Sequence, residues 1–265
     1  MRLWTVTREG AVVVAEYHRG GANYVVDAAV EELAGIARSL RGDDAARCLV
    51  LTGRSGEPFI THFDPEQILQ GVLAPETVVR RGPVRNAAVG ELFGVLSSLP
   101  FPVVAALSGD AMGFGFELAL ACDLRIGQSG DALYGLPEVR LGIIPGAGGT
   151  QRLVRLIGFD RAFDIVVRGR ALSPEAALAA GIVTEVVADA RARALELGHE
   201  FAGLPPVAVA VAKRALHAGV DAPLSAALTI ESDASVRAKL APEARDHLEE
   251  YVSMSPSQRR EWLKR

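Results

Sequence analysis

The sequence predicts an α/β fold with a sheet-bearing core over residues 1–200 and a helical region over residues 201–265. Apolar runs of strand length, rich in β-branched residues, concentrate in the first half of the chain and alternate with segments of helical spacing. In the second half only helical patterns are evident. No serine- or proline-rich linker separates the two regions, so we do not expect them to be independent domains.

Composition and charge narrow the class of protein. The chain has 265 residues, of which 49% are hydrophobic and 23% charged, as in ordinary globular proteins with a full core. A net charge of -4 argues against nucleic acid as a partner, because nucleic-acid-binding domains are usually basic. The two cysteines lie in apolar runs without a CxxC pair or a Cys/His cluster, so no metal site is expected. No apolar run reaches membrane-spanning length and no signal peptide is evident, which predicts a cytoplasmic protein without membrane contact.

The order of elements follows from apolar periodicity and from turn residues. Strands are expected at residues 3–7, 11–17, 47–52, 103–107, 124–126 and 132–134. Helices are expected at residues 25–41, 84–99, 116–122, 150–157, 160–168, 174–180, 190–204, 206–218 and 224–265. In the segment before the second of these helices, Asp64 precedes Pro65 and is a candidate helix N-cap.

The most informative stretch is residues 102–123. A buried strand is followed by a loop with three glycines between Ser108 and Gly115, and then by an apolar helix. Glu117 is the one charged residue of this helix and lies in its first turn. A helix N-terminus after a glycine loop can bind an anion, and a carboxylate there can transfer a proton. The alternative is a surface glutamate that complements the helix dipole.

Two long motifs carry a family resemblance. Residues 102–126 read PVVAALSGDAMGFGFELALACDLRI, and residues 133–158 read LYGLPEVRLGIIPGAGGTQRLVRLIG. With LSPEAALAAGIVTEVV and LPPVAVAVAKRAL further on, the chain closely resembles the crotonase (enoyl-CoA hydratase/isomerase) family, most densely over residues 100–216. The resemblance implies a crotonase (ClpP-like) spiral of ββα units with a helical C-terminal region. It also implies an acyl-CoA substrate, no cofactor apart from the coenzyme A of that substrate, and a homotrimer or dimer of trimers.

The resemblance also carries the family's functional residues onto this chain. It makes Glu138 the acid/base at the α-carbon of a 2-enoyl thioester, and Glu117 the group that positions and activates the water. Two carboxylates at one site tend to separate their pKa values, so that one donates a proton while the other accepts. The family's oxyanion hole, two backbone N–H groups, falls on Phe63 and Phe114. Residues expected to line the substrate site are His62, Asp64, Gly113 and Pro137.

The chain departs from the family pattern around the oxyanion hole. Thr61-His62-Phe63-Asp64 stands where the family usually has Ala-Gly-Ala-Asp, and Phe114 replaces the middle glycine of a triplet. Backbone donors survive such replacements where the backbone torsions are compatible, but the phenylalanines are expected to crowd or reshape the acyl pocket. His62 is either a loop histidine with a local hydrogen bond or an acid/base in the site.

The reaction itself stays open at this point. Hydration of a 2-enoyl-CoA, a lyase reaction of fatty acid metabolism, is the expected activity. A double-bond isomerase, or a hydrolase that cleaves β-diketones with His62, would use the same fold, and so would a binding or scaffold protein without catalysis. Arginines 80, 81 and 85 belong either to a solvated loop or to a site for the coenzyme A phosphates. The glycine-rich segment 142–149 lacks the lysine of a P-loop and is expected to be a structural turn.

Overall fold

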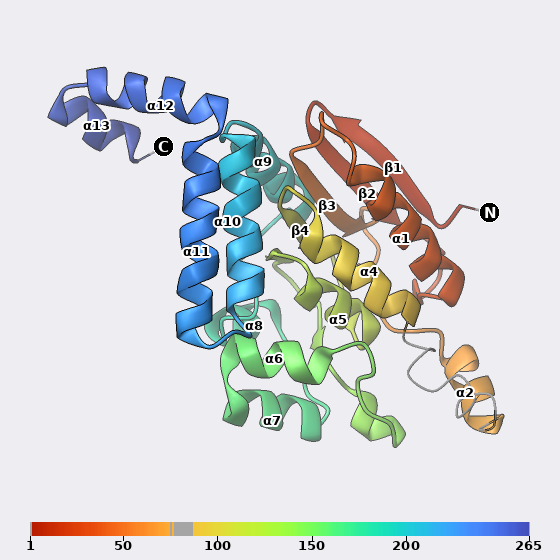
Figure 1. Ribbon diagram of the computed structural model, residues 1–265. Coiled ribbons are helices and arrows are strands. Elements are labelled where there is room, and N and C mark those ends of the chain that lie inside the picture. The colour runs from red at the N-terminus through yellow and green to blue at the C-terminus, as the bar shows by residue number, and fades with distance from the viewer. Residues whose placement is uncertain (1, 75, 77–86, 265) are drawn as a thin grey trace. The chain divides into compact units, whose positions relative to one another are not determined.

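The computed structural model describes residues 2–74, 76 and 87–264 of the chain (Figure 1). It divides into two compact units, Met1–Ala202 and Gly203–Arg265. The larger unit holds both sheets and the smaller one is helical. The three arginines at positions 80, 81 and 85 lie outside the described residues.

Six strands of the described residues form the main sheet of the first unit. Their order across the sheet is β1 (Trp4–Glu9), β2 (Val12–Tyr17), β3 (Cys48–Gly53), β4 (Val103–Leu107), β6 (Leu124–Gln128) and β9 (Glu185–Val187). The β1–β2 pair is an antiparallel hairpin, and the other neighbours pair in parallel. The central strands read as continuous apolar runs because both faces of a parallel sheet are covered.

Helices cover the two faces of this sheet. On one face, α1 (Asp27–Leu40) and α4 (Ala87–Ser98) lie side by side and belong to the larger hydrophobic cluster (Figure 1). On the other face, α9 (Ala190–Ala202) packs Ala190, Ala194 and Leu197 against alternate residues of the central strands. Helix α9 lies very close to the sheet, because a Cβ added to Gly198 would lie only 2.9 Å from the Val12 side chain of β2.

A second, three-stranded sheet of the described residues consists of β5 (Ala111–Met112), β7 (Tyr134–Gly135) and β8 (Ala171–Leu172). The expectation of helices alone in the second half of the chain was wrong, because both β8 and β9 lie there. These strands have two and three residues, respectively, which is too short to show the alternation that identifies a strand.

The remaining helical segments of the first unit connect these strands. They are α2 (Pro65–Leu73), α5 (Phe114–Ala121), the 3₁₀ helix η2 (Glu138–Leu141), α6 (Gly149–Ile157), α7 (Phe159–Val167) and α8 (Pro174–Ala179). Asp64 caps α2 as predicted, since its side chain accepts hydrogen bonds from the N–H groups of Glu66 and Gln67. The helix expected at residues 116–122 begins two residues earlier, at Phe114.

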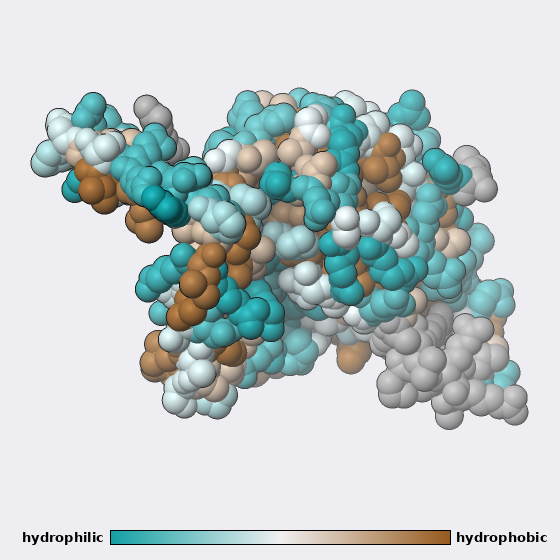
Figure 2. Space-filling view, turned by 45° about the horizontal axis from the view of Figure 1, so that its top comes forward, coloured by the Kyte–Doolittle hydropathy of each residue, from teal (hydrophilic) through white to brown (hydrophobic). Residues whose placement is uncertain are grey.

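The second unit is helical, as expected. It consists of α10 (Pro206–Gly219), α11 (Leu224–Lys239), α12 (Pro242–Ser253) and α13 (Pro256–Trp262). Helices α10 and α11 lie side by side (Figure 1). Apolar side chains such as Leu216, Leu224 and Leu240 are largely exposed, and Figure 2 shows apolar patches on the surface of these helices. Among the described residues, no helix has both the length and the apolar character needed to cross a membrane.

Candidate active site

Helix α5 places Glu117 in the interior of the first unit. The helix starts after Gly113, whose φ of 52° is accessible to glycine at little cost, and Glu117 lies in the first turn. Only 3% of Glu117 is exposed, and its Oε1 accepts hydrogen bonds from the N–H groups of Ala147 and Gly149, both at 2.8 Å. A Cβ at Gly149 would lie 2.9 Å from that oxygen. The glycine-rich segment is therefore more than a turn, because it holds the carboxylate in place.

The surroundings of Glu117 keep a proton on it into the neutral range. Burial raises the pKa of Glu117 to about 7, and the charge of Glu138 acts in the same direction. The hydrogen bonds from Gly149 and Ala147 and the charge of Arg152 lower the pKa but do not outweigh burial. Gly113 connects the two predicted carboxylates, because its carbonyl accepts from the Glu117 N–H at 2.9 Å and a Cβ added to it would lie 3.0 Å from Glu138 Oε1.

Glu138 is also buried. It begins the 3₁₀ helix η2 after Pro137. Its exposed fraction is 4%, and burial raises the pKa of Glu138 to about 7. Its Oε2 has no hydrogen-bond partner among the described residues. Two interacting carboxyls that both titrate near neutrality can share one proton, so that one donates while the other accepts.

The residues of the expected oxyanion hole lie side by side. The Val25 N–H donates to the His62 carbonyl at 2.9 Å, and the Asp64 N–H donates to the Val25 carbonyl at 2.8 Å. Because successive N–H groups of extended backbone point to opposite sides, the Phe63 N–H points away from Val25. Phe114 is the first residue of α5, so its N–H has no acceptor within the helix.

Close backbone packing brings these two segments together. A Cβ at Gly115 would lie only 2.0 Å from the Ile60 carbonyl oxygen, so α5 rests directly on the segment that leads to Phe63. The rings of Phe63 and Phe114 meet edge to face with centroids 5.9 Å apart. Phe114 also stacks on Phe93 at 6.1 Å. The two phenylalanines that replace small family residues thus pack against each other and against α4.

His62 lies beside Glu138. Its Nδ1 is 2.9 Å from the Phe63 carbonyl oxygen, which is the local hydrogen bond expected of a loop histidine. Its Nε2 is buried and has no partner among the described residues. A Cβ at Gly113 would lie 2.8 Å from that Nε2 and 3.0 Å from Glu138 Oε1. The structure therefore brings His62, Gly113 and Glu138 together.

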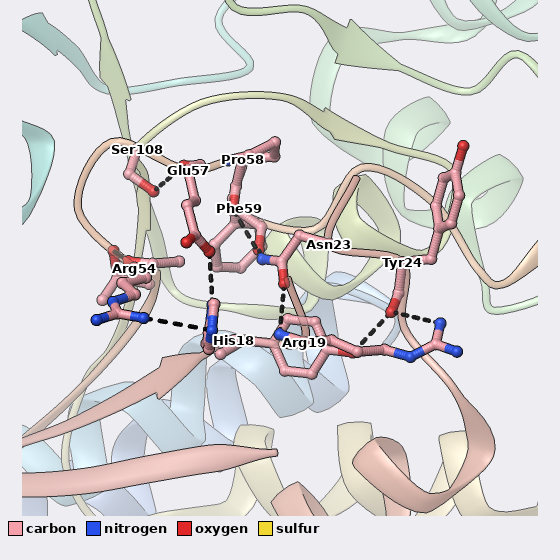
Figure 3. A network of polar contacts seen from close by, with 12 residues as sticks. His18, Arg19, Asn23, Tyr24, Arg54, Glu57, Pro58, Phe59 and Ser108 are labelled. Atoms are coloured by element: carbon pink, nitrogen blue, oxygen red, sulfur yellow. Dashed lines mark hydrogen bonds and ion pairs between the residues drawn. The ribbon is translucent and has the colours of Figure 1, made fainter. Parts of the chain in front are cut away.

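A polar network positions the segment before His62, and the sequence patterns did not predict it (Figure 3). Asn23 is fully buried at a φ of 53°, and its amide donates to the carbonyls of Pro58 at 2.9 Å and Phe59 at 3.0 Å (Figure 3). His18 contacts Glu57 at 2.6 Å in the same network. The network fixes the backbone that leads to the expected oxyanion donor Phe63.

The contacts of Asp64 hold the backbone in place. Besides capping α2, its carboxylate pairs with the Arg19 guanidinium at 2.5 Å. That hydrogen bond, with those from the backbone of α2, keeps the pKa of Asp64 below its ordinary value. Asp64 therefore anchors the segment after Phe63. Among the described residues, no group of three or more His, Cys, Asp or Glu side chains is arranged to hold a metal ion.

Comparison with known proteins decides the family. The sequence model described as enoyl-CoA hydratase/isomerase matches residues 7–255. The chain belongs to the enoyl-CoA hydratase/isomerase family. It is 36% identical to the Bacillus subtilis protein YngF over 238 residues, which cover 88% of this chain and 87% of the relative. It is 32% identical to a short-chain-enoyl-CoA hydratase of Clostridium acetobutylicum, with 86% and 85% covered.

Solved structures confirm the fold. The crystal structure of an enoyl-CoA hydratase from Bacillus anthracis superposes with a TM-score of 0.82 at 32% identity, over 94% of this chain and 95% of that one. The predicted crotonase fold is thereby confirmed. Members of the enoyl-CoA hydratase/isomerase family share this scaffold, so the reaction depends on the residues described above.

The buried carboxyl of Glu138 predicts a stability effect that depends on pH. Its folded pKa of about 7 lies above the ordinary value of 4.5, so the folded state binds more protons between these pH values. Wild-type protein therefore loses stability as the pH rises from 4.5 to about 7, because the buried carboxyl has to ionise. Glutamine does not ionise. We expect the unfolding free energy of Glu138→Gln relative to wild type to be about 1–3 kcal/mol higher at mildly alkaline pH than at acidic pH.

Urea unfolding of both proteins across this pH range measures the difference. Glu175→Gln is the matched control, because Glu175 lies in the first turn of α8 and is exposed. It replaces a glutamate by glutamine without removing a buried carboxyl. A Glu138→Gln effect that changes with pH no more than that of Glu175→Gln would contradict the assignment of a raised pKa to Glu138.

Proposed function

We propose that this member of the enoyl-CoA hydratase/isomerase family adds water across the double bond of a 2-enoyl-CoA thioester. The observation that carries the proposal is the pair of buried glutamates, Glu117 and Glu138, whose pKa values are both raised to about 7. A neutral and an ionised carboxyl at one site are what a reaction needs when it removes one proton and delivers another. The family likeness supports the same assignment.

In the proposed reaction one proton leaves the water, another is delivered to the substrate, and a new C–O bond forms. The water oxygen bonds to C3 of the enoyl group while ionised Glu117 takes a proton from the water. The π electrons move toward C2 and the thioester oxygen, and the protonated Glu138 delivers its proton to C2. The product is a 3-hydroxyacyl thioester, and proton exchange with solvent restores both carboxyls. Coenzyme A enters as part of the substrate, and the scheme needs no other cofactor.

The developing negative charge on the thioester oxygen requires hydrogen-bond donors. In the proposed arrangement they are the N–H groups of Phe63 and Phe114, of which the second also benefits from the positive end of the α5 dipole. The edge-to-face contact between the two phenylalanine rings supports this pairing. The same packing leads us to propose that the side chains of Phe63 and Phe114 form a wall of the acyl pocket.

The experiment that tests the proposal follows the loss of enoyl thioester absorbance with purified protein. Short, medium-length and aromatic 2-enoyl-CoA substrates cover the acyl groups that the sequence leaves open. We expect turnover of at least one of them, with the 3-hydroxyacyl-CoA as product. A folded protein that binds acyl-CoA but turns over none of these substrates would contradict hydration. A protein that binds no acyl-CoA would support the alternative of a scaffold.

The position of His62 favours a second candidate reaction. A histidine whose buried Nε2 faces Glu138 could instead serve a hydrolase that cleaves the C–C bond of a β-diketone. The two reactions separate in His62→Ala. A hydratase that depends on the two glutamates keeps measurable activity, whereas a histidine-dependent hydrolase loses essentially all cleavage.

We also propose that the chain assembles as a homotrimer or a dimer of trimers. Exposed apolar side chains support this, among them Phe159 and Phe163 on α7, at 66% and 53% exposed. Light scattering of the protein as it elutes from a size-exclusion column should give a molar mass about three or six times the chain mass of 28.0 kDa. A mass equal to one chain across the micromolar range would contradict the proposal.

A further inference from the structure

Two buried polar atoms of the candidate site are left without partners. Among the described residues, such side-chain atoms are Thr61 Oγ1, His62 Nε2, Glu138 Oε2 and Arg191 Nε. His62 Nε2 and Glu138 Oε2 belong to side chains that meet at Gly113. Buried polar atoms in folded proteins nearly always have a hydrogen-bond partner, so an unpaired set at one place indicates that something else supplies it.

The hydrogen-bonding role of the His62 ring follows from its local contact. Nδ1 lies 2.9 Å from the Phe63 carbonyl oxygen, and a carbonyl only accepts, so Nδ1 carries a hydrogen. In the neutral imidazole the other nitrogen, Nε2, is then an acceptor. For the neutral ring, the missing partner of His62 is therefore a hydrogen-bond donor.

The geometry also shows that the two side chains are neighbours. A Cβ added to Gly113 would lie 2.8 Å from His62 Nε2 and 3.0 Å from Glu138 Oε1, so both atoms lie close to the same side of this glycine. Within the described part of the chain, neither a hydrogen bond nor an ion pair joins the His62 ring to Glu138. Two neighbouring polar groups that are not hydrogen-bonded to each other are suited to a single bridging oxygen.

We infer that His62 Nε2 accepts a hydrogen bond from a hydroxyl oxygen that also contacts Glu138. The inference rests on the proposed function, in which this oxygen is that of the water that adds to the double bond and then the 3-hydroxyl of the product. His62 is thus a third group that orients the nucleophile, beside Glu117 and Glu138. A hydroxyl that the acyl group already carries at C2 would supply the same hydrogen bond.

Two substitutions separate the roles of the two ring nitrogens. His62→Asn places its amide nitrogen near the position of Nδ1 and can keep the bond to the Phe63 carbonyl, but it has no atom at Nε2. His62→Gln reaches the position of Nε2 with an amide oxygen that can accept. His199→Ala is the control for histidine replacement in general, because His199 is exposed on α9.

The measurement is the affinity of each variant for butyryl-CoA, 3-hydroxybutyryl-CoA and 2-hydroxybutyryl-CoA by calorimetry. In His62→Asn, we expect the affinity for 3-hydroxybutyryl-CoA to fall about three- to tenfold while that for butyryl-CoA is unchanged, the size of one neutral hydrogen bond. His62→Gln should restore most of the loss, and His199→Ala should show none. A loss confined to the 2-hydroxy ligand would also support the acceptor role and would assign the hydroxyl to C2.

The outcomes distinguish this inference from the proposed function. If wild-type protein hydrates enoyl-CoA and His62→Asn binds all three ligands in the same ratios as wild type, the inference is overturned and the proposed function stands. If His62→Asn weakens all three ligands equally, His62 has only a structural role, which also overturns the inference. A wild-type protein that binds none of the ligands and hydrates no enoyl-CoA overturns both.

Discussion

Replacement of Glu117 by Gln should lower kcat for the proposed enoyl-CoA hydration by about 10²–10⁴-fold, with a much smaller change in KM. Glutamine keeps the size of the side chain, and its carbonyl oxygen can still accept from Ala147 and Gly149, as Glu117 Oε1 does at 2.8 Å. What it removes is the ability to take a proton from water. The effect should therefore appear in the chemical step rather than in substrate binding.

The second carboxylate should behave as part of the same unit. Glu138→Gln should lose a similar factor in kcat, and the double variant should lose little more than either single one, because each needs the other to move a proton. Glu175→Gln should keep wild-type kcat, since this exposed first-turn glutamate represents the ordinary surface position that Glu117 could have occupied. Retention of kcat within a few-fold of wild type in Glu117→Gln would remove Glu117 from the proposed mechanism.

The second large effect is expected from Gly115→Ala. The added Cβ would lie 2.0 Å from the Ile60 carbonyl oxygen and 2.8 Å from Ile60 Cβ, and the carbonyl belongs to backbone that cannot rotate away. Either α5 or the segment before Phe63 has to move, which separates the two amides of the proposed oxyanion hole. We expect kcat/KM for hydration to fall about 10²–10³-fold, and the free energy of unfolding to fall by about 1–3 kcal/mol.

A matched glycine provides the control. Gly94 lies in helix α4, and apart from the backbone of that helix no atom would lie within 4 Å of a Cβ added to it. Gly94→Ala should leave kcat/KM unchanged and stabilise the protein by about 0.5–1 kcal/mol, because alanine loses less backbone entropy in a helix. Activity and thermal unfolding of both variants give the comparison. Wild-type activity in Gly115→Ala would show that the contact between α5 and Ile60 does not control the site.

Those parts of the fold that have long regular patterns were predictable from the sequence. Strand β4 is apolar throughout and helix α5 is apolar apart from Glu117, whose lone charge in that setting pointed to a special role. The capping role of Asp64 followed from the proline after it. These features depend on neighbours in the sequence, which is the information that a pattern contains.

The rest of the site depends on contacts between distant segments. The bonds that hold Glu117 come from residues 30 and 32 positions further along the chain, and no periodicity encodes them. The 3₁₀ turn of Glu138 and the short strand β8 are likewise imposed by tertiary packing. Asn23 gave little signal as a loop asparagine, although its left-handed backbone and two amide hydrogen bonds make it a support of the segment before His62. A loop asparagine tolerates such a backbone better than most residues, which is the one clue that was available.

A crystal structure with a bound acyl-CoA tests the central claim most directly. The claim is that the segment around Phe63, the start of α5 and the 3₁₀ turn of Glu138 form one site for a thioester. We expect the thioester oxygen to accept hydrogen bonds from the N–H groups of Phe63 and Phe114 at about 2.7–3.1 Å, with both glutamates facing C2 and C3. A thioester oxygen that contacts neither amide, or an acyl group remote from Glu117 and Glu138, would contradict the claim.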